Sequence, residues 1–510
     1  MAYEAKVNYN DVFSQVRMWD MLIYNFLRKE NIVIPPKEDN VKEDKYDGAY
    51  VKDPLTGMHK WVVSFDINSL YPHLIMQYNI SPEKIIGVKS SGISVAKLLK
   101  QQTPLSHLKT EGACITPNGA MFKNDNPGFL PRLLEKMYND RVKFKTLEFE
   151  SKQEYQKTKD KELTKKIATY HNIQWAKKIS LNSAYGAIGN QYFRYYDVRQ
   201  ATAITTSGQF VIRFIENKVN EYMNNILKTH DKVDYIVASD TDSIYLTLDK
   251  LVDVTCKDKP VEHILRFINK VVDSRIQPFL DKCFAELADY TNAIGNKMVM
   301  KREVIADKGI WTAKKRYMLN VLDEEGIVYE KPKLKIMGIE AVKSSTPEVC
   351  RGKIKEAINL IMTKDQDTLQ KFVADFRTEF EKMSAEQISF PRSCNNLAKY
   401  RHANDVFIKG TPIHVKGALI YNHQIQQYKL GNKYPLIQEG DKIKFVKLVE
   451  PNPFKFDVIS YITKLPKEFK LDDYIDHDIM FQKTFLDPLS FILNSIGWSY
   501  EKKASLEAFF

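Results

Sequence analysis

Two aspartates in a short polar turn, Asp240 and Asp242, are the residues of this 510-residue sequence best suited to chemistry. Apolar, β-prone runs at 235–238 and 244–246 flank the turn, which predicts a hairpin whose strands are at least half buried. Residues two apart on an extended chain point to the same side, so we expect the carboxylates to share one patch. Hard oxygen ligands suit Mg²⁺, which is bound by one or two carboxylates together with substrate phosphates. Ordinary turn chemistry, in which Asp is common, explains the pair equally well when it is taken alone.

Asp66 is the expected partner of this pair. It ends the apolar run 61–65, which predicts a buried strand, and a carboxylate in that position is placed to meet a ligand outside the sheet. The segment 65–68, Phe-Asp-Ile-Asn, resembles a proofreading exonuclease motif without its second acid. The following segment 69–72, Ser-Leu-Tyr-Pro, resembles motif A of family B DNA polymerases. We prefer the second interpretation because the later segments follow in the order that this family requires, whereas a helix N-cap by Asp66 explains neither Tyr71 nor the proline.

Residues 128–190 predict two antiparallel helices that meet near 158–163. Arg141 and Lys145 are four residues apart and therefore lie on one helical face. On the returning helix, polar residues at spacings of four, four and three also share a face: Gln174, Lys178, Asn182 and Tyr185. Together the two faces would present three cations and an amide, the groups that a triphosphate needs. A solvated helix with salt bridges is the alternative, and it is favoured for Arg141 and Lys145 taken alone.

The composition of the chain limits the kinds of molecule that we expect it to bind and the compartment in which we expect it. A net charge of +12 and a pI near 9.0 favour a polyanion, most simply nucleic acid. Five scattered cysteines without Cys-x-x-Cys spacing indicate neither a disulfide framework nor a zinc site and fit a reducing cytosol. We find no leader segment and no run of 18 apolar residues, so neither secretion nor membrane spanning is expected.

Further segments extend the resemblance to family B DNA polymerases. The segment 178–186 is similar to motif B, and 235–244, with its Asp-Thr-Asp-Ser core, is similar to motif C. Lys-Lys-Arg-Tyr at 314–317 resembles the basic-aromatic motif that grips the primer strand. Two more segments, 335–340 and 344–347, resemble the replicative polymerases of T-even-type bacteriophages more narrowly. Four motifs in the required order make the resemblance specific, and it covers nearly the whole chain.

The resemblance implies an α+β fold, the right-hand polymerase core, with an antiparallel-sheet palm, helical-hairpin fingers and a mainly helical thumb. The implied domains, in chain order, are an N-terminal extension packing on the core at 1–60, the first part of the palm at 61–127, the fingers at 128–186, the second part of the palm at 187–340, the thumb at 341–500 and a clamp-binding tail at 501–510.

Site residues are implied one by one through the matching motifs. Two Mg²⁺ ions, for which Mn²⁺ can substitute, would be held by Asp66, Asp240 and Asp242. The incoming deoxynucleotide would be bound by Ser69, Leu70, Tyr71, Arg141, Lys145, Lys178, Asn182 and Tyr185. Primer and template would be contacted by Gly186, Lys314, Lys315, Arg316 and Tyr317. Tyr71 resembles the steric gate, whose ring leaves no room for a ribose 2′-hydroxyl.

The sequence also departs from the family. His73 and Met76 stand where relatives usually carry Ser and Arg. We find no counterpart of the family's N-terminal and exonuclease domains, so we expect proofreading to be absent from this chain. A natural half of a split polymerase and a truncated polymerase are both compatible with the sequence. For a split protein we predict a second polypeptide that carries those domains, because exposed apolar surface favours association.

Two other functions stay open. An RNA-synthesising enzyme is disfavoured by Tyr71, and a DNA-binding polymerase subunit that is inactive without a second chain is the other alternative. The resemblance to phage polymerases implies the cytoplasm of a bacterial host as the site of action.

Beyond residue 340 the sequence predicts helices at 349–362, 369–383 and 474–496, the first one preceded by a capping box at 345–348. Basic residues of this part are expected to contact duplex phosphates in a salt-dependent manner. The last residues give an apolar i, i+3, i+4 pattern typical of sliding-clamp-binding peptides, although Lys503 replaces the usual Gln: Leu506, Phe509 and Phe510. Folding of this tail back onto the thumb is the alternative.

Overall fold

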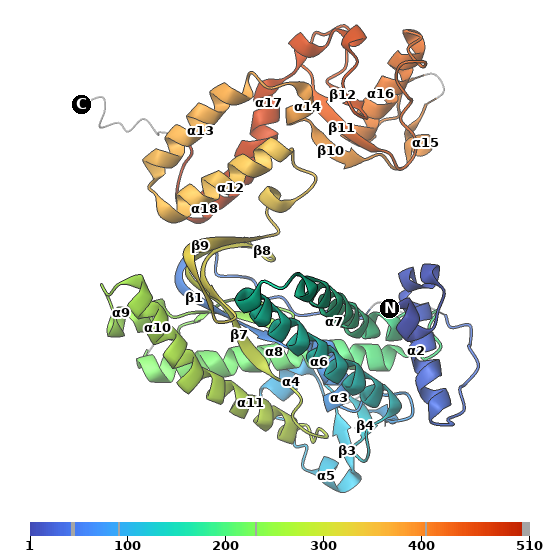
Figure 1. Ribbon diagram of the computed structural model, residues 1–510, viewed down its shortest axis with the longest axis vertical. Helices are drawn as coiled ribbons and strands as arrows, with labels where there is room; N and C mark the ends of the chain where they lie inside the picture. The colour runs from blue at the N-terminus through green and yellow to red at the C-terminus, as the bar shows by residue number, and fades with distance from the viewer. Residues whose placement is uncertain (42–45, 90–91, 230–231, 403–404, 502–510) are drawn as a thin grey trace. The chain divides into compact units, whose positions relative to one another are not determined.

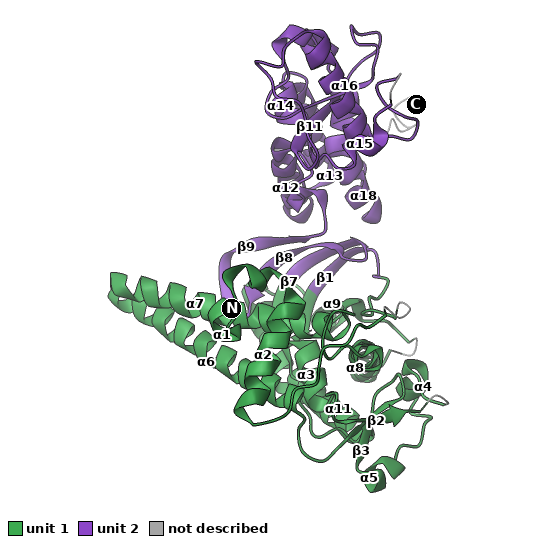
Figure 2. Cartoon of the chain, turned by 90° about the vertical axis from the view of Figure 1, so that its right-hand side faces the viewer, with its two compact units in different colours: residues 1–53, 62–305 green, residues 54–61, 306–510 purple. Residues whose placement is uncertain are grey.

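The computed structural model describes residues 1–41, 46–89, 92–229, 232–402 and 405–501 (Figure 1). The chain divides into two compact units, which are coloured in Figure 2. Unit 1 comprises residues 1–53 and 62–305, and unit 2 comprises residues 54–61 and 306–510. Among the described residues, no helix has the length and apolar character that crossing a membrane requires.

Unit 1 holds most of the long helices. Its helices are α1 (Ala2–Ala5), α2 (Gln15–Lys29), α3 (Leu70–Gln77), α4 (Val95–Leu99), α5 (His107–Glu111), α6 (Phe129–Thr158), α7 (Lys161–Ile188), α8 (Val198–Leu227), α9 (Asp249–Thr255), α10 (Val261–Val271) and α11 (Gln277–Tyr290). The helices of unit 2 are α12 (Glu348–Thr363), α13 (Gln366–Phe380), α14 (Ala385–Ile388), α15 (Leu397–Tyr400), α16 (Ile413–Gln427), α17 (His477–Phe481) and α18 (Asp487–Ser495).

The largest sheet has the strand order β5-β6-β1-β7-β8-β9. Its strands are β1 (Gly57–Ile67), β5 (Ile236–Asp240), β6 (Ser243–Thr247), β7 (Met300–Ala313), β8 (Arg316–Glu324) and β9 (Ile327–Met337). Strands β1 and β7 each contribute residues to both units. The β5–β6 pair is antiparallel and β6 pairs antiparallel with β1, so the predicted hairpin and the predicted buried strand are both confirmed.

Two smaller sheets complete the fold. In unit 1 the order is β2-β4-β3, with strands β2 (Ile85–Val88), β3 (Ala113–Ile115) and β4 (Ala120–Lys123). In unit 2 the order is β10-β11-β12, with strands β10 (Phe390–Ser393), β11 (Lys442–Lys447) and β12 (Val458–Tyr461). The mixture of helices and antiparallel strands agrees with the predicted α+β class.

Helix α8 packs against strands β5 and β6 of the largest sheet. Asp197 caps its first turn by accepting a hydrogen bond from the backbone of Arg199 at 2.9 Å. Its apolar side chains recur with helical spacing and are buried, including Ile204, Phe210 and Ile215. Because this apolar stripe is buried, α8 is held in place against the strands, and we call it the platform helix.

The predicted helical hairpin is present as α6 and α7, with its tip near the expected residues. Lys159 ends α6 in the left-handed conformation (φ 57°), and Asp160 caps α7 through the backbone of Glu162 at 2.9 Å. The side chain of Lys177 is buried on α7 and forms ion pairs with Asp140 on α6, at 3.1 Å, and with Glu4 on α1, at 2.6 Å. The hairpin is therefore tied internally and to the first helix of the chain.

The core of unit 2 is rich in aromatic rings. Phe376 is fully buried, and its ring centroid lies 4.8 Å from that of Phe485 and 5.6 Å from that of Phe481. Helix α12 begins at the expected place, but Pro347 occupies the N-cap position and no side chain caps the helix. The predicted capping box is therefore wrong, because proline has no N–H to take part in its reciprocal bond.

Candidate active site

The predicted carboxylates occupy one end of the strand group β5-β6-β1. Asp240 on β5 and Asp66 on β1 both pair with Ser243 on the strand between them. Residues directly opposite one another in an antiparallel sheet project from the same face, so Asp66 and Asp240 share a face two strands apart. Asp242 lies in the connecting turn, and its carbonyl accepts a hydrogen bond from the backbone N–H of Ile67 at 2.8 Å. Asp66, which is distant in sequence from Asp240 and Asp242, is thus their neighbour in the fold.

The turn that carries Asp242 is strained. Thr241 has φ 59°, in the left-handed region that β-branched residues rarely adopt. Its hydroxyl donates to Asp240 Oδ1 at 2.9 Å, and the Asp242 N–H donates to the Asp240 carbonyl at 2.6 Å. Such conformations cost on the order of 1–3 kcal/mol and cluster at functional sites.

The donor chemistry of these acids fits a hard divalent cation. Among the described residues, no group of three or more His, Cys, Asp or Glu side chains is arranged to hold a metal ion by itself. Mg²⁺ bound with a nucleotide requires only one or two carboxylates, because phosphate oxygens and water complete its octahedron. Asp66, Asp240 and Asp242 are therefore the residues that would hold Mg²⁺ together with a substrate.

Two tyrosine rings contact each other at a tilted angle near the Asp242 carboxylate. The ring centroids of Tyr71, on α3, and Tyr185, on α7, are 4.9 Å apart with an interplanar angle of 50°. Burial, reinforced by the Asp242 carboxylate, raises the pKa of Tyr71 to about 12, so its hydroxyl stays protonated. A Cβ on Gly208 of α8 would lie 3.2 Å from the Tyr71 ring, so a larger residue there would press on the ring.

The start of α3 is the next part of the site. Ser69 precedes the helix with φ 47°, and its hydroxyl accepts a hydrogen bond from Arg141 Nη1 at 3.1 Å. Arg141 Nε is buried and has no hydrogen-bond partner among the described residues, and burial lowers the guanidinium pKa. Because the first N–H groups of a helix lack intrahelical partners, this terminus and Arg141 together favour an anion.

His73 lies in α3, close to its start, and its side chain is buried. Its Nδ1 lies 3.0 Å from the Ser69 carbonyl oxygen, and its ring meets that of Tyr138 edge to face at 4.5 Å. Burial lowers the pKa of His73, and the nearby cations Lys297 and Arg141 lower it further. The imidazole is therefore neutral near pH 7 and acts as a fixed support of Ser69.

The remaining predicted triphosphate contacts are more exposed. Lys145 and Asn182 face solvent on the hairpin, and Lys178 is half buried with its Nζ 5.1 Å from the centroid of the Trp175 ring. Gln174 is buried and donates to Glu148 Oε2 at 3.2 Å. Its amide is engaged inside the hairpin, so it does not extend the polar face that the helical spacing predicted. The roles of Lys145, Lys178 and Asn182 stay predictions.

Sequence reasoning missed two residues near Tyr185. The hydroxyl of Tyr46 lies against Gly189, where any side chain would collide with it, and burial together with a side-chain hydrogen bond with Tyr46 raises the pKa of Tyr185. Gln15, at the start of α2, donates to the carbonyl oxygen of Ser183 and fills the space beside Gly186. Both come from segments without a recognisable motif, and only their polar or aromatic character could have marked them.

The basic-aromatic motif forms a tight turn in unit 2. Lys314 and Lys315 are the exposed turn residues between β7 and β8. Gly338, at φ 68°, lies so close to the Lys315 carbonyl oxygen that a Cβ at position 338 would collide with it. Arg316 pairs with Glu340 at 2.6 Å, and Tyr317 stacks on a buried tryptophan at 5.5 Å. The contacts of Arg316 and Tyr317 hold the turn that carries the two lysines. Contact of these lysines with a primer stays a prediction.

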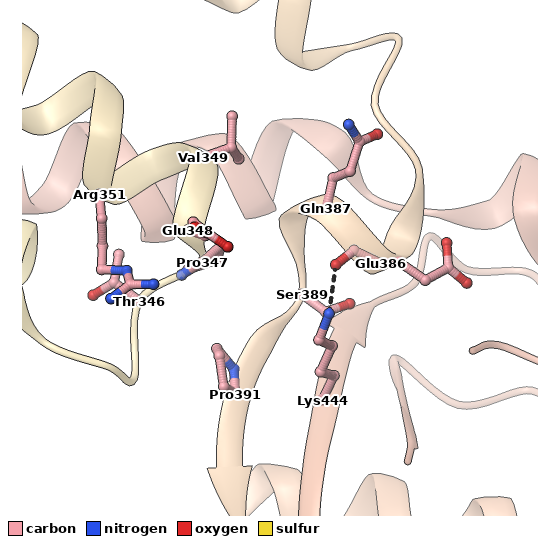
Figure 3. Close-up of a pocket in the computed structure, with 10 residues that line it drawn as sticks. All are labelled: Thr346, Pro347, Glu348, Val349, Arg351, Glu386, Gln387, Ser389, Pro391 and Lys444. Atoms are coloured by element: carbon pink, nitrogen blue, oxygen red, sulfur yellow. Dashed lines mark hydrogen bonds between the residues drawn. The ribbon is translucent and has the colours of Figure 1, made fainter. Parts of the chain in front are cut away.

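A pocket of about 480 Å³ lies where α12 begins, next to β10 and β11 (Figure 3). Lys444 points to α14, where its Nζ donates to the Glu386 carbonyl oxygen at 2.9 Å. The pocket is lined by Arg351 as well as by the acids Glu348 and Glu386. Because charges of both signs are present, we assign no ligand to it.

The three residues predicted to bind a clamp lie outside the described part of the structure: Leu506, Phe509 and Phe510.

Comparison with known proteins shows the family to which the chain belongs. The sequence pattern of DNA polymerase family B matches residues 11–452, so the chain belongs to that family. It is 35% identical over 99% of its length to the DNA-directed DNA polymerase of Escherichia phage RB69 and 34% identical over its whole length to that of Enterobacteria phage T4. It is 27% identical over 67% of its length to a DNA polymerase of Pyrococcus glycovorans. The resemblance to T-even-type phage polymerases is confirmed. The chain spans about three fifths of the length of the two phage relatives, covering 61% and 62% of them.

Proposed function

We propose that this chain is the polymerase core of a DNA polymerase, which adds deoxynucleotides to a primer 3′ end under the direction of a template. The observation that carries the proposal is the pairing of both Asp66 and Asp240 with Ser243, next to Asp242 and Tyr71. Carboxylates, a phenol and a cationic helix start are the groups that nucleotidyl transfer needs. Family membership supports the same reaction.

The residues would divide the work as follows. Two Mg²⁺ ions, when bound, would lower the pKa of the primer 3′-hydroxyl and neutralise charge on the leaving pyrophosphate. Asp66, Asp240 and Asp242 would hold them, and the backbone at Ser69 and Leu70 would donate to phosphate oxygens. Arg141 would bind the triphosphate beside them. No covalent intermediate is needed, because in-line attack on the α-phosphate depends on positioning and electrostatics.

On the hairpin, Lys145, Lys178 and Asn182 would complete the triphosphate contacts. Tyr71 would block a ribose 2′-hydroxyl, and Tyr185 and Gly186 would lie beside the nascent base pair. In this proposal the strands with the acids form the palm, α6 and α7 form the fingers, and the helices of unit 2 form the thumb. The lysines at 314 and 315, with Arg316 and Tyr317, would bind the primer.

A primer-extension assay on this chain tests the proposal. We expect Mg²⁺-dependent extension, which Mn²⁺ also supports, and loss of more than about 100-fold with Asp242→Ala, since even supporting residues of metal sites alter activity by 10–100-fold. An Asp253→Ala variant, which removes a carboxylate from α9, is the matched control and should keep its activity. Extension that survives Asp242→Ala would refute the metal-based mechanism.

A second chain with the exonuclease function is part of the proposal, and an exposed aromatic surface at the N-terminus supports it. Tyr3, Tyr9 and Phe13 are 98%, 78% and 82% exposed. Aromatic side chains are enriched at protein interfaces. If the chain alone fails to extend primers but does so after co-expression with such a partner, the alternative of an inactive DNA-binding subunit is correct. Independent elution of the two chains in size-exclusion chromatography would exclude the complex.

We also propose a sliding clamp as a partner of the C-terminal tail and the host cytoplasm as the site of action. Deletion of residues 506–510 should leave short, distributive synthesis unchanged and abolish clamp-dependent long extension. Loss of both activities would instead assign the tail a structural role.

A further inference from the structure

The strand that carries Asp240 lies at the edge of its sheet. In the order β5-β6-β1-β7-β8-β9, β5 pairs with β6 on one side, and the described part of the chain places no strand on its other side. An edge strand leaves a row of backbone N–H and C=O groups unpaired, and such edges open more readily than central strands. A catalytic aspartate at the end of an edge strand therefore needs support from elsewhere.

A short segment covers this edge at the catalytic turn. Val51 forms an isolated antiparallel bridge with Asp240. The backbone N–H of Lys52 donates to the Ser239 carbonyl at 3.0 Å, and the N–H of Thr241 donates to the Tyr50 carbonyl at 2.9 Å. The two bonds fall on either side of Asp240, so the segment 50–52 clamps the backbone of that residue.

The Lys52 side chain anchors the segment. Its Nζ lies 2.7 Å from Glu216 Oε1 on α8 and 2.7 Å from Asp234 Oδ2, just before β5. The Lys52 and Glu216 side chains are only 10% and 12% exposed, so water screens this pair little. Glu216 also accepts a hydrogen bond from the hydroxyl of buried Ser239, at 3.3 Å. One lysine therefore connects the platform helix α8, the entrance of β5 and the clamping segment.

We propose that Lys52 is a positioning residue for the catalytic turn, holding the segment 50–52 against the edge of β5 and thereby fixing Asp240 and Asp242. This inference rests on the proposed polymerase function, but its central statement concerns the backbone of the turn. Lys52 does not touch substrate, so its effect must act through the two aspartates. Removing the charge of Lys52 would leave Glu216 and Asp234 without their shared cation. The segment 50–52 would then be free to separate from the edge of β5.

Lys52→Met is the direct test, and Lys84→Met is its matched control. Lys84 is also a buried lysine of unit 1 with two oxygen partners, Asp125 and Asn126, but it supports no part of the site. Hydrogen exchange followed by mass spectrometry should show about 10-fold faster exchange in peptides covering 239–243 of Lys52→Met, because their edge protection is lost. The same peptides should be unchanged in Lys84→Met.

Primer extension gives the second measurement. We expect Lys52→Met to lower kcat about 10–100-fold and to raise the Mg²⁺ concentration at half-maximal rate, with little change in the KM for nucleotide. If Lys52→Met does not fold, Glu216→Gln, which keeps an oxygen for Ser239 and removes one ion pair, should give a smaller effect of the same kind.

The outcomes separate the two proposals. Unchanged exchange at 239–243, or equal acceleration across all of unit 1, overturns the role of Lys52 even if the enzyme is active. An unchanged Mg²⁺ requirement with a reduced melting temperature does the same, because it makes Lys52 merely structural. A wild-type chain without polymerase activity refutes the proposed function, while the exchange result still decides whether Lys52 fixes the turn.

Discussion

Replacing Arg141 is the most direct test of the proposed nucleotide-binding part of the site. Its guanidinium is half buried, and burial lowers its pKa, so the cation has already lost part of its hydration. Nη1 donates to the Ser69 hydroxyl, whereas Nε is buried without a partner among the described residues. A cation in this state gains more from an incoming phosphate than an exposed lysine does.

The size of the effect follows from the bonds that are lost. A hydrogen bond to a charged group contributes about 1.5–3 kcal/mol, and each 1.4 kcal/mol is about tenfold in affinity. We therefore expect Arg141→Met to raise the KM for the incoming nucleotide about 10–150-fold. Arg141→Lys should fall between Arg141→Met and wild type, because a lysine keeps the charge but not the planar fork.

Single-nucleotide incorporation on a primed template, measured across nucleotide concentrations, separates KM from kcat. Lys143→Met is the matched control, because Lys143 is exposed on the same helix, and it should change KM by less than about twofold. Arg141→Met should fold normally, since replacing a buried, partly unpaired cation with an apolar side chain is often neutral. A KM for Arg141→Met within about twofold of wild type would refute the assignment of Arg141 to the triphosphate.

Three further predictions concern other parts of the molecule. Tyr71→Ala should lower the preference for deoxynucleotides over ribonucleotides by about 10-fold or more in kcat/KM, and an unchanged ratio would contradict the steric gate. The pKa of His73 is lowered in the folded protein below its ordinary value of 6.5. As the pH falls, the unfolded chain therefore takes up the His73 proton before the folded chain does. The free energy of unfolding should thus fall as the pH drops from about 6.5 to the lower pKa of the folded state. Urea titrations across this range should show that His73→Gln flattens the dependence, whereas an identical slope would assign it to other groups. Phe376→Ala should destabilise unit 2 by about 3–5 kcal/mol in urea unfolding, and a loss below about 1 kcal/mol would show that its aromatic cluster collapses around the cavity.

The local pattern of the sequence predicted the β5–β6 hairpin well. Continuous apolar runs on both sides of a polar turn define β5 and β6, and both strands are buried over nearly their whole length. The position of Asp66 beside this hairpin depends on a long-range contact, because Asp66 and Asp240 are 174 positions apart in the chain. The family motifs, rather than periodicity, suggested that these segments meet.

Other features could not be predicted because their signals are tertiary. Helical spacing placed Gln174 on the same face as Lys178, but the carboxylate of Glu148 on the facing helix turned its amide inward. The segment with Tyr46 and Lys52 carries no motif, and its importance arises only from what it touches. The short strands of the β10-β11-β12 sheet likewise have too few residues for a clear alternation within a part of the chain dominated by helical patterns.

The two ion pairs of Lys177 have a mechanical consequence. Asp140 belongs to the same hairpin as Lys177, so that contact would be kept if the hairpin rotated as a rigid body. Glu4 lies in α1, so its contact must either break or draw the first helix along. The Glu4–Lys177 ion pair therefore couples the position of α1 to that of the hairpin.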